Sequence, residues 1–384
     1  MRVLKPLAVA LALSASAAAL PAAASAHAGS GSPVVGHVYV NDNTVPANTV
    51  AGFARHADGD LTPLAGSPFS AGGAGTGAGV GSQGSLQTAV DGRYLLAVDA
   101  GSNQISVLRT FHDGTLTLVD RSPVSSDGTL PVSIAIHQRL VYVANAGNGA
   151  VNYTGFILGR DGRLRPLPAS TVTLPDGSQP GDVLFNATGT KLAGTRVGTS
   201  LIDSFAVGFD GRLHAAPGSP YTAQGPGPFG SEFSPTRPDE LFVSNAHGGA
   251  AAGSVSAFRV AFDGALSPVG ASPFADHQTA PCWVEISHDG HYLFAINTAQ
   301  PSISRYAINW DGSLTLLGST SFKNPTGLAP VDARLSPDGR TLWVTDSGTP
   351  GVSAFAVQGG NLTELASSPT PLPTGAAPFG IVVN

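Results

Sequence analysis

The sequence predicts an all-β fold, a seven-bladed β-propeller with four antiparallel strands in each blade. Three observations predict it: a unit of four short strands between residues 280 and 322, the recurrence of that unit, and chain ends that complement each other. Each blade would be a small sheet, and the sheets would stand around a central channel. Because the repeat continues along nearly the whole chain, we expect residues 29–384 to form one domain.

The clearest unit lies between Ala280 and Phe322. Its polar and apolar residues alternate, aromatic and β-branched residues are frequent, and Asp-Gly separates the last two runs, as in a hairpin. The expected strands are Val284–Ser287, His291–Ile296, Ser302–Ile308 and Ser313–Leu317. The unit therefore has the strand number and the strand length of one propeller blade.

The same hairpin recurs at nearly constant spacing. It stands at Asp58-Gly59, Asp113-Gly114, Asp161-Gly162, Asp210-Gly211, Asp263-Gly264 and Asp311-Gly312, with Gly359-Gly360 in the seventh place. The second residues of successive hairpins are 55, 48, 49, 53, 48 and 48 positions apart. Seven units of four strands at this period are typical of propeller blades and do not match helical repeats.

The two ends of the repeat region complement each other. The first unit begins at Val34 with a segment that matches a second strand, and it lacks a first strand of its own. The last unit is followed by Ala377–Val383, which matches a first strand. We expect this segment to complete blade one from the inside, because such closure removes free sheet edges between the chain ends. The ends of the domain should therefore be adjacent.

Residues 1–28 have the three parts of a secretory signal peptide. A basic start is followed by the apolar run Leu7–Leu20, which is too short to span a membrane, and small residues allow cleavage near Ala26 or Ala28. We therefore expect a secreted protein without a membrane span. Cys282 is the only cysteine, so no internal disulfide is possible and the core must provide the stability.

The composition excludes several classes of function. Hydrophobic residues make up 42% of the chain and charged residues 11%, which indicates a globular protein rather than a disordered one. The net charge of −6 provides no basic surface for nucleic acid. No Gly-x-Ser-x-Gly elbow and no P-loop occur in the sequence. We expect a monomer that requires no cofactor.

The expected first strands of the blades share a pattern. Most open with a proline, and Gln83 takes that place in blade two: Pro131, Pro180, Pro228, Pro281, Pro330 and Pro378. Proline suits the first residue of a strand because no ladder hydrogen bond is lost there. Residues one and three places later, such as Phe379 and Ile381, are mostly apolar, and those two and four places later are often polar. Alternation then predicts that the apolar set packs between blades and that the polar set faces the channel.

Loops of similar type should gather on one face of the ring. With each first strand descending, the loops between blades and between second and third strands form an upper face, and the Asp-Gly hairpins form a lower face. The two longest insertions, in Ala71–Gly84 and Asn245–Gly253, both belong to the upper face. Insertions on one face often mark a binding surface. They can equally be insertions without a function, because a longer loop costs little additional free energy.

Carboxylates from different blades are expected at similar depth in the channel. Asp182, Glu232 and Glu285 are the candidate catalytic acids and bases, and Arg196 is the candidate that would stabilise an anion or a carbonyl. The same oxygens could instead hold Ca²⁺ in the channel. They could also simply hydrogen-bond neighbouring blades or channel water. The pattern leaves these alternatives open.

Four further residues are candidates for binding a substrate. Trp283 could stack on a ring-shaped ligand or pack between blades. Asp332 and Arg334 belong to the polar set of blade seven, and the arginine could bind an anionic group or form a structural ion pair. His247 lies on the upper side near Cys282, but its spacing to other ligand types is irregular, so no metal ligand is assigned.

Three segments carry a resemblance to a known family: Ser336–Asp346, Leu140–Asn145 and the Gly218-Ser219-Pro220 turn after an outer strand. They resemble the lactonase-type seven-bladed propellers, the family that contains 6-phosphogluconolactonase and carboxymuconate cyclase. The resemblance covers about residues 34–384. It implies the ring opening of small lactones by His, Arg and Glu side chains at the mouth of the channel.

The chain departs from the family's pattern in blades four and five. The family's inner-strand histidine falls at Gly181, its Gly-Pro-Arg-His segment reads Gly227-Pro228-Phe229-Gly230, and its Asn-Glu reads Asn245-Ala246. Two functions therefore stay open. The first is hydrolysis of a small cyclic ester at the upper mouth of the channel, by a site that has moved to the channel carboxylates. The second is non-catalytic extracellular binding of a glycan, a peptide or a partner protein through the upper face.

Overall fold

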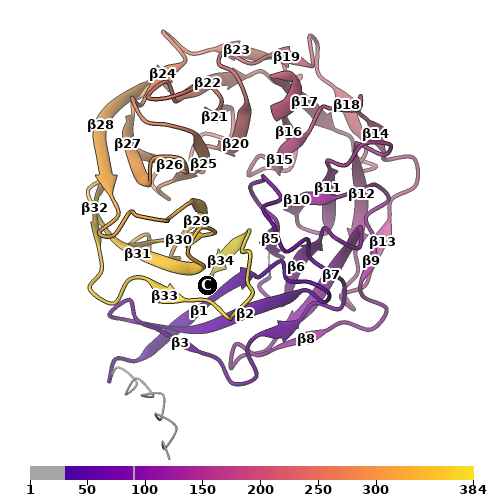
Figure 1. Cartoon of the computed structure of the whole chain (residues 1–384). Coiled ribbons are helices and arrows are strands. Elements are labelled where there is room, and N and C mark those ends of the chain that lie inside the picture. The colour runs from indigo at the N-terminus through magenta and orange to yellow at the C-terminus, as the bar shows by residue number, and fades with distance from the viewer. Residues whose placement is uncertain (1–30, 90) are drawn as a thin grey trace, which may run out of the picture. The chain divides into compact units, whose positions relative to one another are not determined.

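The computed structural model describes residues 31–89 and 91–384, and the expected signal peptide lies outside them. Ser32–Asn384 form one compact unit in which seven antiparallel β-sheets stand in a ring (Figure 1). The prediction of a seven-bladed propeller is confirmed. A single 3₁₀ turn, η1 (Val197–Thr199), is the only helical element of the described residues. None of them forms a helix that is long and apolar enough to cross a membrane.

Each blade has four strands, which follow one another from the channel outward, and in most blades the outer strand is broken into two pieces. Blade one contains β34 (Ile381–Val383), β1 (Val34–Asn41), β2 (Thr49–His56), β3 (Leu61–Pro63) and β4 (Phe69–Ser70). Blade two contains β5 (Leu86–Thr88), β6 (Tyr94–Asp99), β7 (Gln104–Thr110), β8 (Leu116–Leu118) and β9 (Val124–Ser125). Blade three contains β10 (Pro131–His137), β11 (Leu140–Asn145), β12 (Asn152–Leu158), β13 (Leu164–Pro166) and β14 (Val172–Thr173).

The remaining blades repeat this arrangement. Blade four contains β15 (Pro180–Phe185), β16 (Lys191–Arg196), β17 (Leu201–Val207), β18 (Leu213–Ala215) and β19 (Tyr221–Thr222). Blade five contains β20 (Pro228–Phe233), β21 (Glu240–Asn245), β22 (Ser254–Val260), β23 (Leu266–Pro268) and β24 (Phe274–Ala275). Blade six contains β25 (Pro281–Ile286), β26 (Tyr292–Asn297), β27 (Ser302–Ile308) and β28 (Leu314–Ser321). Blade seven contains β29 (Pro330–Leu335), β30 (Thr341–Asp346), β31 (Gly351–Gln358), β32 (Asn361–Glu364) and β33 (Thr370–Pro371).

The hairpin glycines explain why the repeat can be recognised in the sequence. All seven have a positive φ, between 74° and 88°: Gly59, Gly114, Gly162, Gly211, Gly264, Gly312 and Gly360. Side chains with a Cβ rarely adopt this region, so glycine is required for the turn. A Cβ on Gly114 would also lie 2.3 Å from the ring of His37 in the preceding blade. The turn glycine therefore serves both the hairpin and the packing between blades.

The chain ends close the ring as expected. β34 pairs antiparallel with β1, and Val40 stands opposite Ile381 in the register. Tyr39 stands opposite Val382. Val40 and Ile381 are fully buried in one hydrophobic cluster with Trp343 of blade seven. Blade one is thus built from both ends of the domain, and neither segment forms that sheet alone.

The long loop between β4 and β5 does not stay on the upper face. Its last residues, Ser82–Ser85, enter the channel and exchange hydrogen bonds with the inner segments of the six other blades. Their partners are Val132 and Ile134 in blade three, Gly181 in blade four, Ser231 in blade five, Trp283 and Val284 in blade six, Asp332 in blade seven and Phe379 in blade one. Figure 1 shows this indigo-to-purple loop reaching the middle of the ring. We call Ser82–Ser85 the channel segment.

Aromatic rings from three blades meet above the channel segment. The ring of Trp283 lies 5.2 Å from that of Phe229 in blade five and 6.2 Å from that of Phe379 in blade one. Val80 packs against the same cluster. Blade one is not a neighbour of blade five or six, so these rings meet across the axis. The upper end of the channel is therefore filled by protein.

The expected alternation along the first strands is wrong for their upper ends. The pairing register shifts between Pro281 and Trp283, and equivalent shifts occur in β10, β15, β20 and β29. An extra residue in one strand breaks the two-residue period locally. Phe379, expected between blades, also lies among the rings that meet across the axis. Below the shift, the residues of the predicted polar set do face the channel.

Candidate functional site

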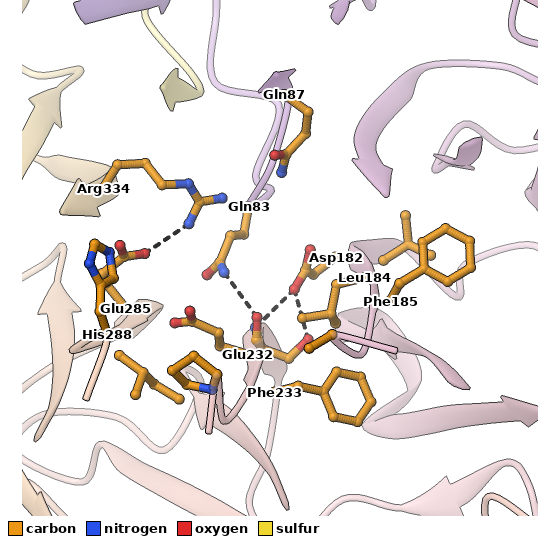
Figure 2. A pocket seen from close by; sticks show the side chains of 15 residues that line it. Gln83, Gln87, Asp182, Leu184, Phe185, Glu232, Phe233, Glu285, His288 and Arg334 are labelled. Carbon is orange, nitrogen blue, oxygen red and sulfur yellow. Dashed lines mark hydrogen bonds and ion pairs between the residues drawn. The ribbon is translucent and has the colours of Figure 1, made fainter. Parts of the chain in front are cut away.

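A cavity of about 330 Å³ lies in the channel below the channel segment. Gln83 and Ser231 lie at its upper end, and its lower end is bordered by Ala187, Pro235 and His288. These three residues belong to the turns between first and second strands, which lie on the lower face. Figure 2 shows the polar side chains that converge on the cavity. The predicted position of the site at the upper mouth is therefore wrong, because the channel segment occupies that end.

Glu285 and Arg334 form an ion pair across blades six and seven. The guanidinium donates to Glu285 Oε2 at 2.9 Å, and the backbone N–H of Leu335 donates to Oε1 at 2.8 Å. Burial opposes the charge of Arg334, but the surrounding carboxylates, led by Glu285, raise its pKa. Arg334 is thus charged, and the pair consists of two residues that the sequence pattern places in the channel.

Glu232 projects into the same cavity from blade five. Its Oε2 atom is buried, and no hydrogen-bond donor of the described residues reaches it. Burial, and then the nearby negative charge of Glu285, raise the pKa of Glu232 well above its usual range, although Arg334 opposes the shift. Such a shift favours the protonated form of the carboxyl group. Glu232 can therefore donate a proton or a hydrogen bond to a ligand.

Asp182 lies on the blade-four side of the cavity. Its carboxylate accepts hydrogen bonds from the Ser231 backbone N–H at 2.9 Å, from the Ser231 hydroxyl at 2.7 Å and from the Ser133 hydroxyl at 3.1 Å. Burial raises the pKa of Asp182 to about 7, against the effect of these bonds. A group with this pKa can take a proton and return it at neutral pH, as a general base does.

Asp332 is buried beside the cavity and does not line it. It accepts the Gly84 N–H at 3.2 Å and its neighbour's N–H, that of Ala333, at 2.9 Å. Burial raises the pKa of Asp332. Its main contact holds the channel segment in place. Of the four predicted channel acids, three line the cavity and Asp332 supports its upper boundary.

Arg196 is not brought to the cavity. Its guanidinium forms a bidentate pair with Asp203 on the adjacent strand β17, with a distance of 2.6 Å from Nε to Oδ2. Tyr153 of blade three donates to the same aspartate at 3.0 Å. The structure thus places Arg196 in a buried ion pair between blades three and four, and Arg334 supplies the cation of the cavity instead.

Trp283 and His247 also lie outside the cavity. Trp283 is buried among the rings at the upper end, and its indole N–H donates to Ser82 O at 2.8 Å. No face of this ring is open to a ligand, so the packing alternative holds and the stacking alternative does not. His247 is exposed on the upper loop after β21. Neither residue contacts Glu232, Glu285 or Asp182.

Two residues of the site escape prediction from the sequence. Gln83 stands in the pattern only where other blades have proline, yet its amide donates to Ser231 O at 3.0 Å and accepts from Val284 N–H at 3.1 Å. His288 lies in the lower-face turn between β25 and β26, and it borders the open end of the cavity. No sequence signal identifies Gln83, because its role depends on a loop that folds inward.

The acids do not form a metal site. Within residues 31–89 and 91–384, no group of three His, Cys, Asp or Glu side chains could hold a metal ion. Asp182 and Glu285 each accept a backbone N–H from the next blade, so both also join blades. The cavity is therefore surrounded by two carboxyl groups with raised pKa values, Glu232 and Asp182, and by the guanidinium of Arg334.

Comparison with protein families matches residues 231–379 to the family described as Lactonase, 7-bladed beta-propeller. The matched segment includes Glu232, Glu285 and Arg334, whereas Asp182 precedes it. No curated protein matches the chain.

Solved structures match over nearly the whole chain at low identity. A candidate 6-phosphogluconolactonase of Bacteroides uniformis is 20% identical, covers 92% of this chain and 100% of its own, and has a TM-score of 0.74. A second, from Bacteroides fragilis, is 21% identical, with coverage of 92% and 99% and a TM-score of 0.73. The periplasmic gluconolactonase of Pseudomonas aeruginosa is 18% identical, with coverage of 91% and 98% and a TM-score of 0.72. The resemblance to lactonase-type seven-bladed propellers is confirmed, and these neighbours establish it for the fold.

Proposed function

We propose that this chain hydrolyses a small lactone in the cavity at the lower mouth of the channel. One observation carries the proposal: Glu232 presents a buried, unpartnered carboxyl oxygen beside the Glu285–Arg334 pair. A buried polar atom without a partner costs free energy, and it is retained most readily where a ligand satisfies it. The fold of relatives named as lactonases supports the class of reaction.

The size of the cavity suits this substrate class. Its volume of about 330 Å³ lies at the small end of the range for ligand sites, roughly 300–1,000 Å³. A single sugar-like ring fits such a space, whereas a polymer does not. The side chains of Gln87 and His288 add hydrogen-bonding groups at its border. We therefore place one cyclic ester, with its carbonyl directed toward Arg334, in the cavity.

The ionisation of the side chains suggests their roles. Asp182 takes a proton from water, and the water oxygen forms a bond to the lactone carbonyl carbon. Arg334 stabilises the negative charge that develops on the carbonyl oxygen. The bond between that carbon and the ring oxygen then breaks, and Glu232 gives its proton to the departing oxygen. Glu285 holds the guanidinium in position.

A panel of lactones tests the proposal. We expect Glu232→Gln and Asp182→Asn each to lower kcat by about 10²–10⁴-fold, because each removes one proton-transfer step. Glu240→Gln is the matched control. Glu240 is also a buried acid of blade five, but it pairs with Arg237 at 3.0 Å and Arg259 at 2.9 Å outside the cavity. Absence of turnover by the folded wild-type protein on every lactone would refute the proposal.

We also propose that residues 1–28 direct export and are removed near Ala26 or Ala28. The basic start, the short apolar run and the small residues support this proposal. N-terminal sequencing of the protein collected from the culture medium or periplasm tests it. Recovery of an intact Met1 from the cytoplasm would contradict it.

A second candidate function is the binding of a glycan chain. Three aromatic residues at equivalent hairpin positions are almost fully exposed: Phe209 at 116%, Phe262 at 98% and Trp310 at 90%. They belong to blades four, five and six, on the lower face. A groove beside Phe262 includes the polar residues Asn186 and Thr190 in its lining. Exposed rings beside hydrogen-bonding groups suit sugar rings, which have both apolar and hydroxyl-bearing faces.

Pull-down on insoluble polysaccharides tests this candidate. The triple variant with Phe209, Phe262 and Trp310 replaced by alanine should lose binding. Val45→Ala, an exposed apolar residue on the upper face, should retain it. Equal retention by both variants, or binding of the wild type to lipid vesicles and to no glycan, would remove the candidate.

A further inference from the structure

The cavity is lined by more acidic than basic side chains. Asp182, Glu232 and Glu285 line it, and Arg334 is the only arginine or lysine among its described lining residues. Asp332 adds a fourth carboxyl group directly behind this lining. Three acids and one arginine therefore line the cavity, and a fourth acid lies behind the lining.

The one cation is already engaged. Arg334 Nη1 lies 2.9 Å from Glu285 Oε2, and the nearby Asp332 carboxyl group also acts on the guanidinium. A ligand that carries a phosphate would bring a dianion to a guanidinium whose charge is already balanced. It would also meet the Glu285 carboxylate at close range, where like charges repel strongly because little water screens them. Phosphate sites, in contrast, present uncommitted arginines, lysines or backbone N–H groups.

We infer that the cavity selects uncharged, hydroxyl-bearing lactones and rejects phosphorylated ones. This inference rests on the proposed function, since it names the substrate class of the same site. The unpartnered Glu232 oxygen and the amide of Gln87 offer hydrogen bonds that suit sugar hydroxyls. None of these groups offers a positive charge.

The same charge balance acts on the product. Addition of water to a neutral lactone breaks the ring C–O bond and yields a hydroxy acid, which loses one proton to solvent at neutral pH. The carboxylate formed in this way lies beside Glu285 and beside Glu232, which has given up its proton, and both repel it. A site that binds the neutral ring and repels the anion favours release of the product over its retention.

A matched pair of substrates tests the inference: glucono-δ-lactone and the same lactone phosphorylated at its 6-hydroxyl. We expect kcat/KM to be at least 100-fold higher for the uncharged lactone. Glu285→Gln keeps the acceptor for Leu335 N–H but removes the charge that occupies Arg334, so it should reduce this ratio by at least tenfold. Glu240→Gln should leave the ratio unchanged.

The outcomes separate the inference from the proposed function. Equal or faster hydrolysis of the phosphorylated lactone overturns the inference but still supports the proposal that the protein is a lactone hydrolase. If neither lactone is hydrolysed, the hydrolase proposal fails, and calorimetric binding of the corresponding δ-lactam and its 6-phosphate decides the selectivity. Binding of the uncharged lactam alone supports the inference. Preference for the phosphate, or binding of neither, overturns it.

Discussion

Arg334 donates to one oxygen of Glu285 at 2.9 Å, while the N–H of Leu335 donates to the other oxygen at 2.8 Å. One carboxylate of blade six thus holds both the side chain and the backbone of blade seven. The contact joins two sheets and, at the same time, sets the charge of the cavity. Blade packing and the charge of the cavity are therefore coupled in this pair.

Removing one partner of this buried ion pair should lower the free energy of unfolding more than removing one partner of an exposed ion pair. We expect Arg334→Met to lower the free energy of unfolding by about 3 kcal/mol, because it leaves Glu285 charged and largely buried. The control is Arg165→Met, whose pair with Asp161 is exposed on both sides and should contribute little to stability. Urea denaturation measures both. Equal losses would contradict the buried character of the Arg334 pair.

The channel segment should contribute to stability through Gln83. Gln83→Ala leaves Ser231 O and Val284 N–H without their partners inside the channel, so we expect a loss of about 2 kcal/mol. Hydrogen exchange at the Val284 amide should become faster in the same variant. Gln300→Ala, on an exposed upper loop, is the control. Unchanged exchange at Val284 would mean that the segment does not occupy the channel in solution.

Asp182 should make the protein less stable as pH rises. Its folded-state pKa of about 7 lies above the ordinary value of 3.8. The folded state therefore binds more protons than the unfolded state between about pH 4 and pH 7, and stability falls across that window. Asp182→Asn should flatten this fall, although Asp42 and Asp99, whose burial raises their pKa values to about 7 and about 6, keep part of it.

Denaturation at pH 5 and at pH 8 measures this effect as a difference between variant and wild type. Asp127→Asn is the control, because Asp127 is an exposed residue on an upper loop. A pH dependence of the Asp182 variant identical to that of the wild type would contradict the prediction.

Tryptophan fluorescence should report on the closed upper channel. Trp283 and Trp343 are buried at 2% and 1% exposure, whereas Trp310 is exposed at 90%. Acrylamide should therefore quench one component of the emission strongly, and Trp310→Phe should remove that component. If a strongly quenched component persists in the Trp310 variant, Trp283 is accessible and the channel is open at its upper end.

Closure of blade one predicts that a residue near the chain end is part of the core. Ile381 is fully buried opposite Val40, so Ile381→Ala should cost about 2–5 kcal/mol. Val35→Ala, in the exposed part of the same sheet, should cost little. Thermal and urea denaturation compare the two. A small loss at Ile381 would indicate that the closing strand frays.

Much of the fold could be predicted because local rules repeat. The seven hairpins need glycine at a positive φ, so their spacing shows the period. In blade six, the expected third strand, Ser302–Ile308, is the observed β27, and the others are displaced by a few residues. The closure of blade one could be predicted because the first unit lacks a first strand and an extra strand follows the last unit.

The candidate site could be predicted only in part. Alternation below the register shift places Glu232, Glu285 and Arg334 in the channel. It does not bring Arg196 there, because an aspartate seven residues later pairs with it across a hairpin. The sequence could have indicated this ion pair. Arg196 and Asp203 belong to the second and third strands of one blade, and these strands pair with each other.

The sequence by itself determined the number of blades, their order, the closing strand and the acids that line the channel. These features depend on spacing and alternation, which local backbone geometry imposes on every repeat. Only the tertiary structure decided which end of the channel is open. A glycine-rich loop carries no periodic pattern, and its path is set by hydrogen bonds to strands from six blades that are far apart in the chain.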